Sequence, residues 1–469
     1  MYRELIEPER TKFGPLCMHQ NKRLFGITRS PAFPFDRLVD RPNSKHIVVL
    51  IKEQVCHVQV RDDSGGVFDE GSIKKGLEEC VKQVGDAKFV PSPPVCSFTT
   101  QNRDVWAAMR EKMITAFPKE NQESFEKVND SLFAVSLEEV DPKGDGREPA
   151  KVSLHGFAGR NRWFDKCFNL WVCPGGKAGG NGEHSPCDAV IPNQMTQYIL
   201  EAEAKGTLFQ EASVKATGSV QHLEFRLTPE VLEALTGARV TAAKSCEAID
   251  LIETRFKEFG SEGIRGALGV VPDSFFQAVM QLAYYRLHGK MTATYETAST
   301  RQFFHGRTET IRACTPESRM MCEGFDKKGV ATLKKVELVK GYLESHKQYL
   351  IQASNGKGVD RHLLGLRCML KEEEGMPALF DDIYWRSLSF DLSSSNVSPG
   401  EVYDGLGFGP ATDSGYGINY SIAPGNIRFS VSSRKSKARK HDSQSMRDAI
   451  IKALRDLYTT LSSAPKSKL

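Results

Sequence analysis

Residues 45–60 read KHIVVLIKEQVCHVQV, two apolar runs joined by a short polar connection. Apolar and polar residues alternate along the second run, which is typical of a strand with one buried face. The stretch therefore predicts a β-hairpin. Working outward, SLFAVSL (131–137) and CFNLWVC (167–173) predict further strands. The first part of the chain is thus expected to contain a β-sheet.

Helices are predicted after these strands. NQMTQYILEAEA (193–204) has helical character, and around LEFRLTPEV (223–231) the pattern changes and longer helices follow. A chain of 469 residues exceeds what one hydrophobic core usually covers, so two domains are expected. We place them at residues 1–226 and 227–469.

Two long amphipathic helices are predicted in the second half. DSFFQAVMQLAYYRLHG (273–289) has apolar residues three and four positions apart, with Asp273 or Ser274 as the expected N-cap and Gly289 at the end. MRDAIIKALRDLYTTL (446–461) is the second helix.

A second hairpin is predicted between these helices, from PATDSGYGINYSI (410–422) and IRFSVSS (427–433). Strands and helices are therefore mixed in both halves, and the sequence shows no internal repeat. This mixture predicts an α/β or α+β fold.

Composition is that of an ordinary globular protein. Hydrophobic residues make up 40% and charged residues 26%, and the net charge is +4. These values argue against a disordered or fibrous chain and give no general reason to expect nucleic acid. The basic segment SRKSKARKH (433–441) is either a local basic patch or, the better reading, a solvated loop before the last helix.

The eleven cysteines contain no CxxC pair, so neither a disulfide framework nor a zinc site is indicated, and a reducing compartment is expected. No run of eighteen apolar residues occurs, and the charged start MYRELIEPER is unlike a signal peptide. We therefore expect no transmembrane segment.

The last three residues, Ser467, Lys468 and Leu469, form the tripeptide that an import receptor reads as a peroxisomal address at a free C-terminus. The sequence therefore predicts a peroxisomal location.

The segment NGEHSPCDAV (181–190) contains His184, and its glycine and proline residues disfavour a regular helix. It lies between a predicted strand pair and a predicted helix, in the type of exposed connection where scaffolds present catalytic groups. By itself this pattern leaves two alternatives open: His184 is a catalytic general base, or it merely ends a strand.

Several motifs follow one another along the chain. They are GPLCMHQNKRLFGITRSP (14–31), TTQNRDVWAAMREK (99–112), RNRWFDKCFNLWV (160–172), TATYETASTRQFFHGRTETIRACTPES (292–318), GVDRHLLGL (358–366), LSSS (392–395) and GFGPATDSGYGINY (407–420). In this order they resemble the carnitine/choline acyltransferases. The resemblance implies an α/β fold of two chloramphenicol acetyltransferase-like domains, each a mixed β-sheet flanked by helices. It also implies that residue 1 aligns inside the family's first domain, without the helical stretch that usually precedes it.

The resemblance places the family's catalytic histidine at His184 and its supporting carboxylate at Asp188, although Asp188 could also be a helix N-cap. A histidine suits this role because it can take the proton of the attacking hydroxyl and return it to the leaving thiolate. The family's Ser-Thr-Ser segment stands here as three serines, and Ser395 is expected to donate to the oxyanion. Cys187 is expected to be a packing residue.

The same resemblance implies carnitine as the acyl acceptor. Carnitine enzymes carry arginine where Arg361 stands, and an arginine fork suits the carboxylate that choline lacks. Tyr295 and Thr308 match the other contacts of this carboxylate. Ser393 is expected near the alcohol, and Phe408 against the trimethylammonium group or, alternatively, in the core beside a turn.

Coenzyme A or acyl-CoA is expected as cosubstrate, with no permanently bound cofactor. Its implied contacts are Arg265, Asp273 and Ser299. The family's lysine-rich segment reads GSEGIRGALGVVPD (260–273) here and keeps only Arg265 as a cation.

Leu406 matches the family's gate of the acyl pocket and predicts short or medium acyl chains. The alternative is that Gly405 and Gly407 let the loop shift and leave the pocket open.

We expect a monomer. Two other functions stay open: a non-catalytic relative that binds acyl-CoA or carnitine, and, less in keeping with Arg361, a choline acetyltransferase.

Overall fold

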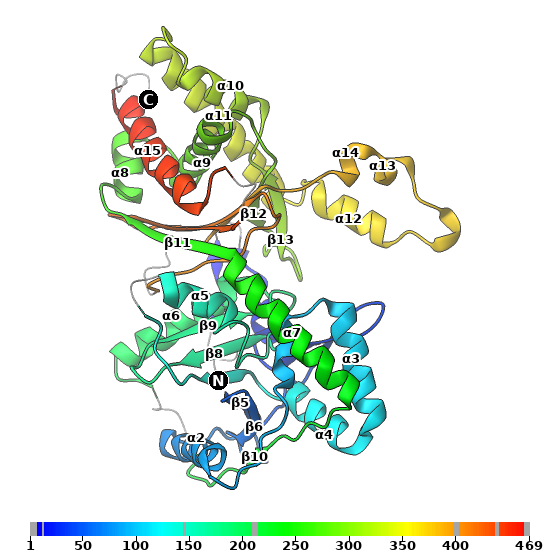
Figure 1. The fold of residues 1–469 in the computed structure, drawn as a ribbon. Helices are drawn as coiled ribbons and strands as arrows, with labels where there is room; N and C mark the ends of the chain where they lie inside the picture. The colour runs from blue at the N-terminus through cyan, green and yellow to red at the C-terminus, as the bar shows by residue number, and fades with distance from the viewer. Residues whose placement is uncertain are drawn as a thin grey trace. The chain divides into compact units, whose positions relative to one another are not determined.

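The computed structural model describes residues 7–11, 14–143, 147–208, 214–397, 403–436 and 440–463. These residues fold into two compact units, drawn in Figure 1. Unit 1 comprises the described residues of Met1–Glu9 and Met18–Glu247, and unit 2 those of Arg10–Cys17 and Ala248–Leu469. Each unit contains one six-stranded mixed sheet flanked by helices, which confirms the α/β class.

Unit 1 is built from helices and strands that are mixed along the chain. They are η1 His19–Arg23, β3 Ile27–Ser30, β4 Arg37–Asp40, β5 His46–Ile51, β6 Gln54–Gln59, α2 Glu70–Gly85, η2 Val95–Thr100, α3 Arg103–Ala116, α4 Pro118–Asn129, β7 Ala134–Leu137, α5 Arg147–His155, β8 Phe168–Val172, β9 Ala178–Gly182, α6 Val190–Ala204, β10 Val220–His222 and α7 Pro229–Ala248. The sheet order is β10-β6-β5-β7-β8-β9, with β7 parallel to both β5 and β8 and the other pairs antiparallel.

The stretch 45–60 forms the predicted hairpin, with β5 and β6 antiparallel. Strand β5 is buried on both faces because it lies inside the sheet. Val48 belongs to the same core cluster as Trp106, whereas Val49 belongs to the cluster of Cys80. The other strands and the helix predicted for this unit are confirmed as β7, β8 and α6.

Helix α7 follows the residues where the domain junction was placed, yet it packs within unit 1. Val231 and Leu235 lie in the same buried cluster as Phe225. Unit 1 therefore extends to Glu247. The functional domains 1–226 and 227–469 stay a prediction.

Unit 2 also combines helices and strands. Its elements are β1 Arg10–Thr11, β2 Gly14–Pro15, β11 Ile249–Phe256, α8 Ser261–Leu268, α9 Pro272–His288, β12 Thr294–Ser299, β13 Thr308–Arg312, α10 Pro316–Phe325, α11 Thr332–Ser354, α12 Asp360–Cys368, η3 Glu372–Glu374, α13 Ala378–Asp381, α14 Ile383–Arg386, β14 Leu392–Asn396, β15 Tyr416–Ile422, β16 Ile427–Arg434 and α15 Ser443–Ser462. The sheet order is β11-β16-β15-β14-β12-β13, with β14 parallel to both β12 and β15.

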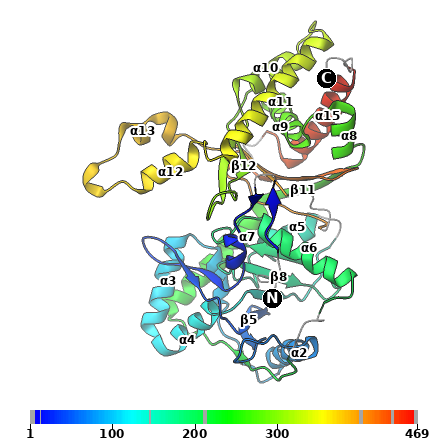
Figure 2. The ribbon, with the colours of Figure 1, turned by 180° about the vertical axis from the view of Figure 1, so that it is seen from behind.

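The sheet of unit 2 has one apolar and one polar face. Ile418, Phe429 and Val431 belong to the core cluster formed with helices α9, α11 and α15, which lie on one side of the sheet in Figures 1 and 2. The residues between them, such as Asn419 and Ser430, point to the opposite face because side chains alternate along a strand. Strand register places the predicted residues Tyr295, Ser299, Thr308, Ser393 and Ser395 on this polar face.

The predicted second hairpin and both long helices are confirmed as β15–β16, α9 and α15. The expected N-cap of α9 is wrong. Helix α9 begins at Pro272 with Val271 at the N-cap, and not at Asp273 or Ser274. Proline favours the first helical position because the N–H it lacks would have no partner within the helix. Gly289 ends the helix in the left-handed conformation, as expected.

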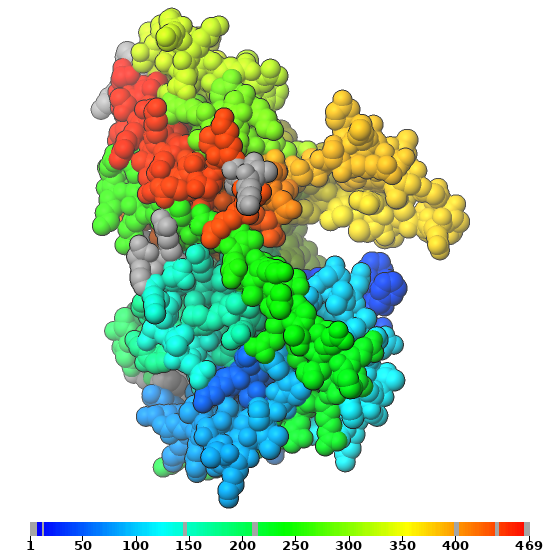
Figure 3. Space-filling view, viewed as in Figure 1, coloured from blue at the N-terminus to red at the C-terminus, as the bar shows by residue number. Residues whose placement is uncertain are grey.

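Residues 359–390 form an arm that includes α12, α13 and α14 and extends from the rest of unit 2 in Figure 3, yellow to orange. Phe380 is the one buried residue of this described segment. The arm bears on the site because α12 carries Arg361.

Within the described ranges, no helix combines the length and apolar composition needed to cross a membrane. All eleven cysteines are free thiols. Two sequence features fall partly or wholly outside the described residues: positions 437–439 of the basic segment, and the terminal Ser467, Lys468 and Leu469.

Candidate active site

His184 lies in the connection between β9 and α6, as the sequence predicts. Its side chain is 71% exposed, and its Nδ1 lies 3.8 Å from Oδ1 of Asp188. This separation is within ion-pair range but too long for a hydrogen bond. Helix α6 has Ala189 at its N-cap, so Asp188 is not the cap. The imidazole of His184 and the carboxylate of Asp188 are therefore neighbours without a direct hydrogen bond between them.

The far end of this loop is held by buried contacts. The Asp188 N–H donates to Oε1 of Gln20 at 2.7 Å, and Gln20 is itself buried. Cys187 is buried with Leu24 and Ile191, which confirms it as a packing residue. The exposed histidine thus belongs to a loop whose backbone is fixed.

Strand β14 separates the three serines by its alternation. Ser394 is buried, where its Oγ donates to the carbonyl of Tyr295 at 2.8 Å and accepts from Nε2 of Gln277 at 3.1 Å. Ser393 and Ser395 point to the opposite, polar face. The two serines that the resemblance singled out therefore share one face, and the third is structural.

Three residues predicted for the carnitine carboxylate come together in unit 2. Nη2 of Arg361 donates to the hydroxyl of Tyr295 at 3.1 Å and lies 3.5 Å from Oγ1 of Thr308. The guanidinium carbon is 6.0 Å from the centre of the Tyr295 ring, at the limit of a cation–π contact. An arginine has five N–H donors, so this arrangement leaves donors for a carboxylate.

Two acidic residues fix the turn that presents Arg361, and the sequence did not single them out. The backbone N–H of Arg361 lies 3.3 Å from each carboxylate oxygen of Glu309. Asp360 accepts two hydrogen bonds from Arg312, at 3.0 and 2.8 Å. Phe390, also not predicted, packs edge-on against Tyr295 at 5.5 Å between ring centres.

Sheet register brings further predicted residues to the same face. Tyr295 is paired with Ser393, and Ser393 with Gly417. A side chain at Gly417 would meet the carbonyl oxygen of Phe408 at 2.9 Å. The backbone at Phe408 therefore crosses the sheet one strand away from Ser393, and only glycine leaves room for it.

Leu406 is half-buried on the same segment. A Cβ at Gly405 would lie 1.7 Å from Oε1 of Glu253, and one at Gly407 would lie 2.8 Å from Leu251. Both glycines thus allow a close approach to β11. Burial raises the pKa of Glu253 to about 7, against the opposing effects of Arg428 and the Leu406 N–H.

The predicted coenzyme A residues lie on separate elements. Arg265 is exposed on α8, Ser299 is exposed at the end of β12, and Asp273 is in the first turn of α9. Asp273 Oδ1 accepts hydrogen bonds from the Tyr420 hydroxyl at 2.6 Å and from Nδ2 of Asn396 at 2.7 Å. In the part of the chain that the structure describes, no hydrogen bond or ion pair joins these three residues to one another.

A buried polar cluster supports this side of the sheet. His346 Nε2 lies 2.6 Å from Oε2 of Glu296, and its Nδ1 lies 2.9 Å from Oγ of Ser274. Burial, and then the nearby Asp273, raises the pKa of Glu296 well above its ordinary value. The ligand atoms of Asp273, Glu296 and His346 are within 4.8 Å of one another, a spacing that a metal ion could bridge. The hydrogen bonds of His346 to Glu296 and Ser274 already hold these side chains together without a metal.

Comparison with known proteins defines the class. Residues 1–452 match the family model described as "Choline/Carnitine o-acyltransferase". Carnitine O-acetyltransferase of Rattus norvegicus is 31% identical over 97% of this chain and 74% of its own length. Mitochondrial carnitine O-palmitoyltransferase 2 of Mus musculus is 31% identical over 95% of this chain and 67% of its own length. The protein is therefore an acyltransferase.

The chain belongs to the choline/carnitine O-acyltransferase family. Among solved structures, the starter condensation domain of rhizomide synthetase is similar with a TM-score of 0.37 and 13% identity, over 75% of this chain and 86% of that chain. A likeness this distant has no bearing on function.

Proposed function

We propose that this protein transfers an acyl group reversibly between coenzyme A and the hydroxyl of carnitine, with no permanently bound cofactor. The observation that carries the proposal is the hydrogen-bonded group of Arg361, Tyr295 and Thr308, which offers a carboxylate a fixed cation and two hydroxyls. Choline has no carboxylate, so this group would be of no use to a choline enzyme.

In the proposed reaction, His184 takes the proton of the carnitine hydroxyl as the oxygen attacks the thioester carbonyl carbon. The carbonyl oxygen becomes an oxyanion, to which the Ser395 hydroxyl donates. The C–S bond then breaks, and the leaving thiolate takes the proton from the imidazolium. Asp188 stabilises the imidazolium in between.

The remaining residues bind substrate in this proposal. Ser393 lies near the alcohol, and Phe408 lies against the trimethylammonium group, where an aromatic face attracts a cation. Arg265, Asp273 and Ser299 bind coenzyme A.

Release of free coenzyme A thiol tests the proposal. Acetyl-CoA is mixed with the full chain and with carnitine, choline or no acceptor, and thiol is measured by a colorimetric reagent. We expect release that depends on carnitine. Release with choline alone would identify a choline acetyltransferase, and no release with any acceptor would favour a non-catalytic binding protein.

The acyl pocket provides a further prediction. We propose that Leu406 fills the space that additional methylenes would need, so short and medium chains are preferred. Leu406→Gly should raise kcat/KM for palmitoyl-CoA by about 5- to 150-fold relative to acetyl-CoA, because overpacking costs about 1–3 kcal/mol. The measurement compares acetyl-, octanoyl- and palmitoyl-CoA in both proteins. A wild type that prefers palmitoyl-CoA, or a variant with an unchanged profile, would rule out this gate.

We further propose that the protein acts as a monomer in the peroxisome, addressed through Ser467, Lys468 and Leu469. In a fluorescently tagged protein with a free C-terminus, deletion of these three residues should turn a punctate image into a cytosolic one. Fluorescence that stays in peroxisomes after the deletion would mean that another signal directs import.

A further inference from the structure

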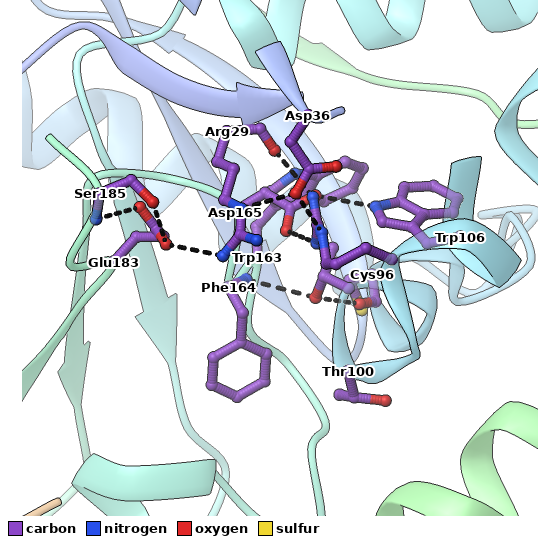
Figure 4. Close-up of polar contacts among 12 residues, drawn as sticks. Arg29, Asp36, Cys96, Thr100, Trp106, Trp163, Phe164, Asp165, Glu183 and Ser185 are labelled. Atoms are coloured by element: carbon purple, nitrogen blue, oxygen red, sulfur yellow. Dashed lines mark hydrogen bonds and ion pairs between the residues drawn. The ribbon is translucent and has the colours of Figure 1, made fainter. Parts of the chain in front are cut away.

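The carboxylate of Glu183 accepts hydrogen bonds from Ser185, the residue on the other side of His184. Oε2 of Glu183 accepts the backbone N–H of Ser185 at 2.8 Å, and Oε1 accepts the Ser185 hydroxyl at 2.9 Å (Figure 4). The Glu183 N–H donates to the carbonyl of Cys167 at 3.2 Å, which continues the pairing of β8 and β9. The residues before and after His184 are therefore joined through one side chain.

Arg29 holds that carboxylate from a different part of the chain. Its Nη1 donates to Oε1 of Glu183 at 3.2 Å, and its Nε donates to Asp36 at 2.6 Å. The backbone of Arg29 is fixed as well, because its N–H donates to the carbonyl of Asp165 at 2.8 Å. Arg29 thus links the histidine loop to β3.

The ionic contacts continue beyond Arg29 into the interior of unit 1, as Figure 4 shows in part. Arg103 donates to Asp36 at 2.8 Å and to Asp165 at 2.5 Å. The indole N–H of the buried Trp106 donates to Asp165 at 2.8 Å. Acidic and basic groups alternate from Asp165 to Glu183, so each ion is held by a partner of opposite charge.

The carboxylates of these contacts are largely shielded from solvent, while the side chains of Arg29 and Arg103 are 35% and 25% exposed. The side chains of Glu183, Asp36 and Asp165 are 12%, 13% and 5% exposed. Burial raises the pKa of Asp36, but hydrogen bonds from Arg103 and Arg29 outweigh it and leave the pKa below its ordinary value. Charge-assisted hydrogen bonds in such surroundings are short and directional. The chain of ion pairs is therefore a rigid support for the loop.

We infer that Glu183 and Arg29 are positioning residues of the transfer reaction, because their ion pair fixes the backbone on both sides of His184 and so sets where the imidazole points. The inference rests on the proposed role of His184 as the base. Small errors in the placement of a reacting group cost rate and leave substrate binding largely unchanged. Loss of the pair should therefore lower kcat.

Glu183→Gln keeps the shape of the side chain but loses the charge and one of the two acceptor oxygens. We expect kcat to fall about 10- to 100-fold, with KM for carnitine and acyl-CoA within about threefold of wild type. Arg29→Gln should behave similarly, while Arg29→Lys, which keeps the charge, should recover part of the loss. Glu120→Gln is the matched control, because Glu120 on α4 also pairs with an arginine, Arg226, at 3.1 Å.

The decisive experiment repeats Glu183→Gln in a His184→Ala protein. A residue that acts through His184 should have no further effect there, so the residual single-turnover rate should change less than about twofold. Thermal unfolding of each variant checks that the fold is kept. An unchanged kcat in Glu183→Gln, a loss that appears mainly in KM, or the same loss in both backgrounds would overturn the inference. Nearly full activity of His184→Ala itself would instead overturn the proposed function and this inference with it.

Discussion

His184→Ala is expected to lower kcat by about 10²- to 10⁴-fold, the contribution of a positioned general base. Without the imidazole, water must take the hydroxyl proton during the attack on the thioester. Since the base acts on the transition state, KM for carnitine and acyl-CoA should stay close to the wild-type values. Steady-state kinetics with acetyl-CoA and carnitine measures both quantities.

An effect of this substitution on kcat can be assigned to the lost imidazole, because the side chain does not contribute to the core. His184 is 71% exposed, so its removal creates no cavity and the thermal midpoint should not change. Asp188→Asn is a graded comparison, because it keeps the base but removes the neighbouring charge, and a smaller loss is expected. Residual activity of His184→Ala within tenfold of wild type would refute the role of general base.

Arg361→Asn should raise KM for carnitine by about 30- to 700-fold, which corresponds to about 2–4 kcal/mol for the loss of one partner of a charge-assisted pair. The substitution leaves the carnitine carboxylate without its cation, while the Tyr295 hydroxyl remains. KM for acyl-CoA should change little, since coenzyme A is bound by other residues in the proposal. Initial rates over a range of carnitine concentrations measure the effect.

Arg367→Asn is the control for this experiment, because Arg367 is an exposed arginine on the same helix α12. It should leave KM for carnitine unchanged. Tyr295→Phe removes one hydroxyl and no charge, so a smaller increase than that of Arg361→Asn is expected. A carnitine KM that is the same in Arg361→Asn and wild type would remove the main support for carnitine as the acceptor.

Much of the fold could be predicted because its elements have clear local patterns. Strand β5 is apolar after His46, and apolar and polar residues alternate along the run that forms β6. Helices α9 and α15 have apolar residues at helical spacing. The start of α9 was misjudged because Asp273 looks like a cap, whereas Pro272 before it already has the fixed φ of a first helical residue. Helix α7 was assigned to the second half because its sequence does not show that its buried residues pack with Phe225.

The candidate site was predicted less completely. Motifs named His184, Ser395 and Arg361, and the resemblance gave roles to Ser393 and Ser395. Only the structure showed that Ser394 between them is buried and hydrogen-bonded to Tyr295 and Gln277. Glu309 was missed because its carboxylate acts on a backbone N–H distant in sequence. A carboxylate in a strand otherwise resembles any other charged residue.

By itself, the sequence determined the α/β class, the main strands and helices and the family resemblance, because hydrophobic periodicity and motif order are properties of neighbouring residues. Only the tertiary structure decided which side chains share a face and which segments hold the histidine loop. Sheet register placed Ser393 beside Tyr295, and an ion pair joined Arg29 to Glu183. Such pairings link segments far apart in the chain, and they form because burial and long-range hydrogen bonding favour one arrangement of the whole unit.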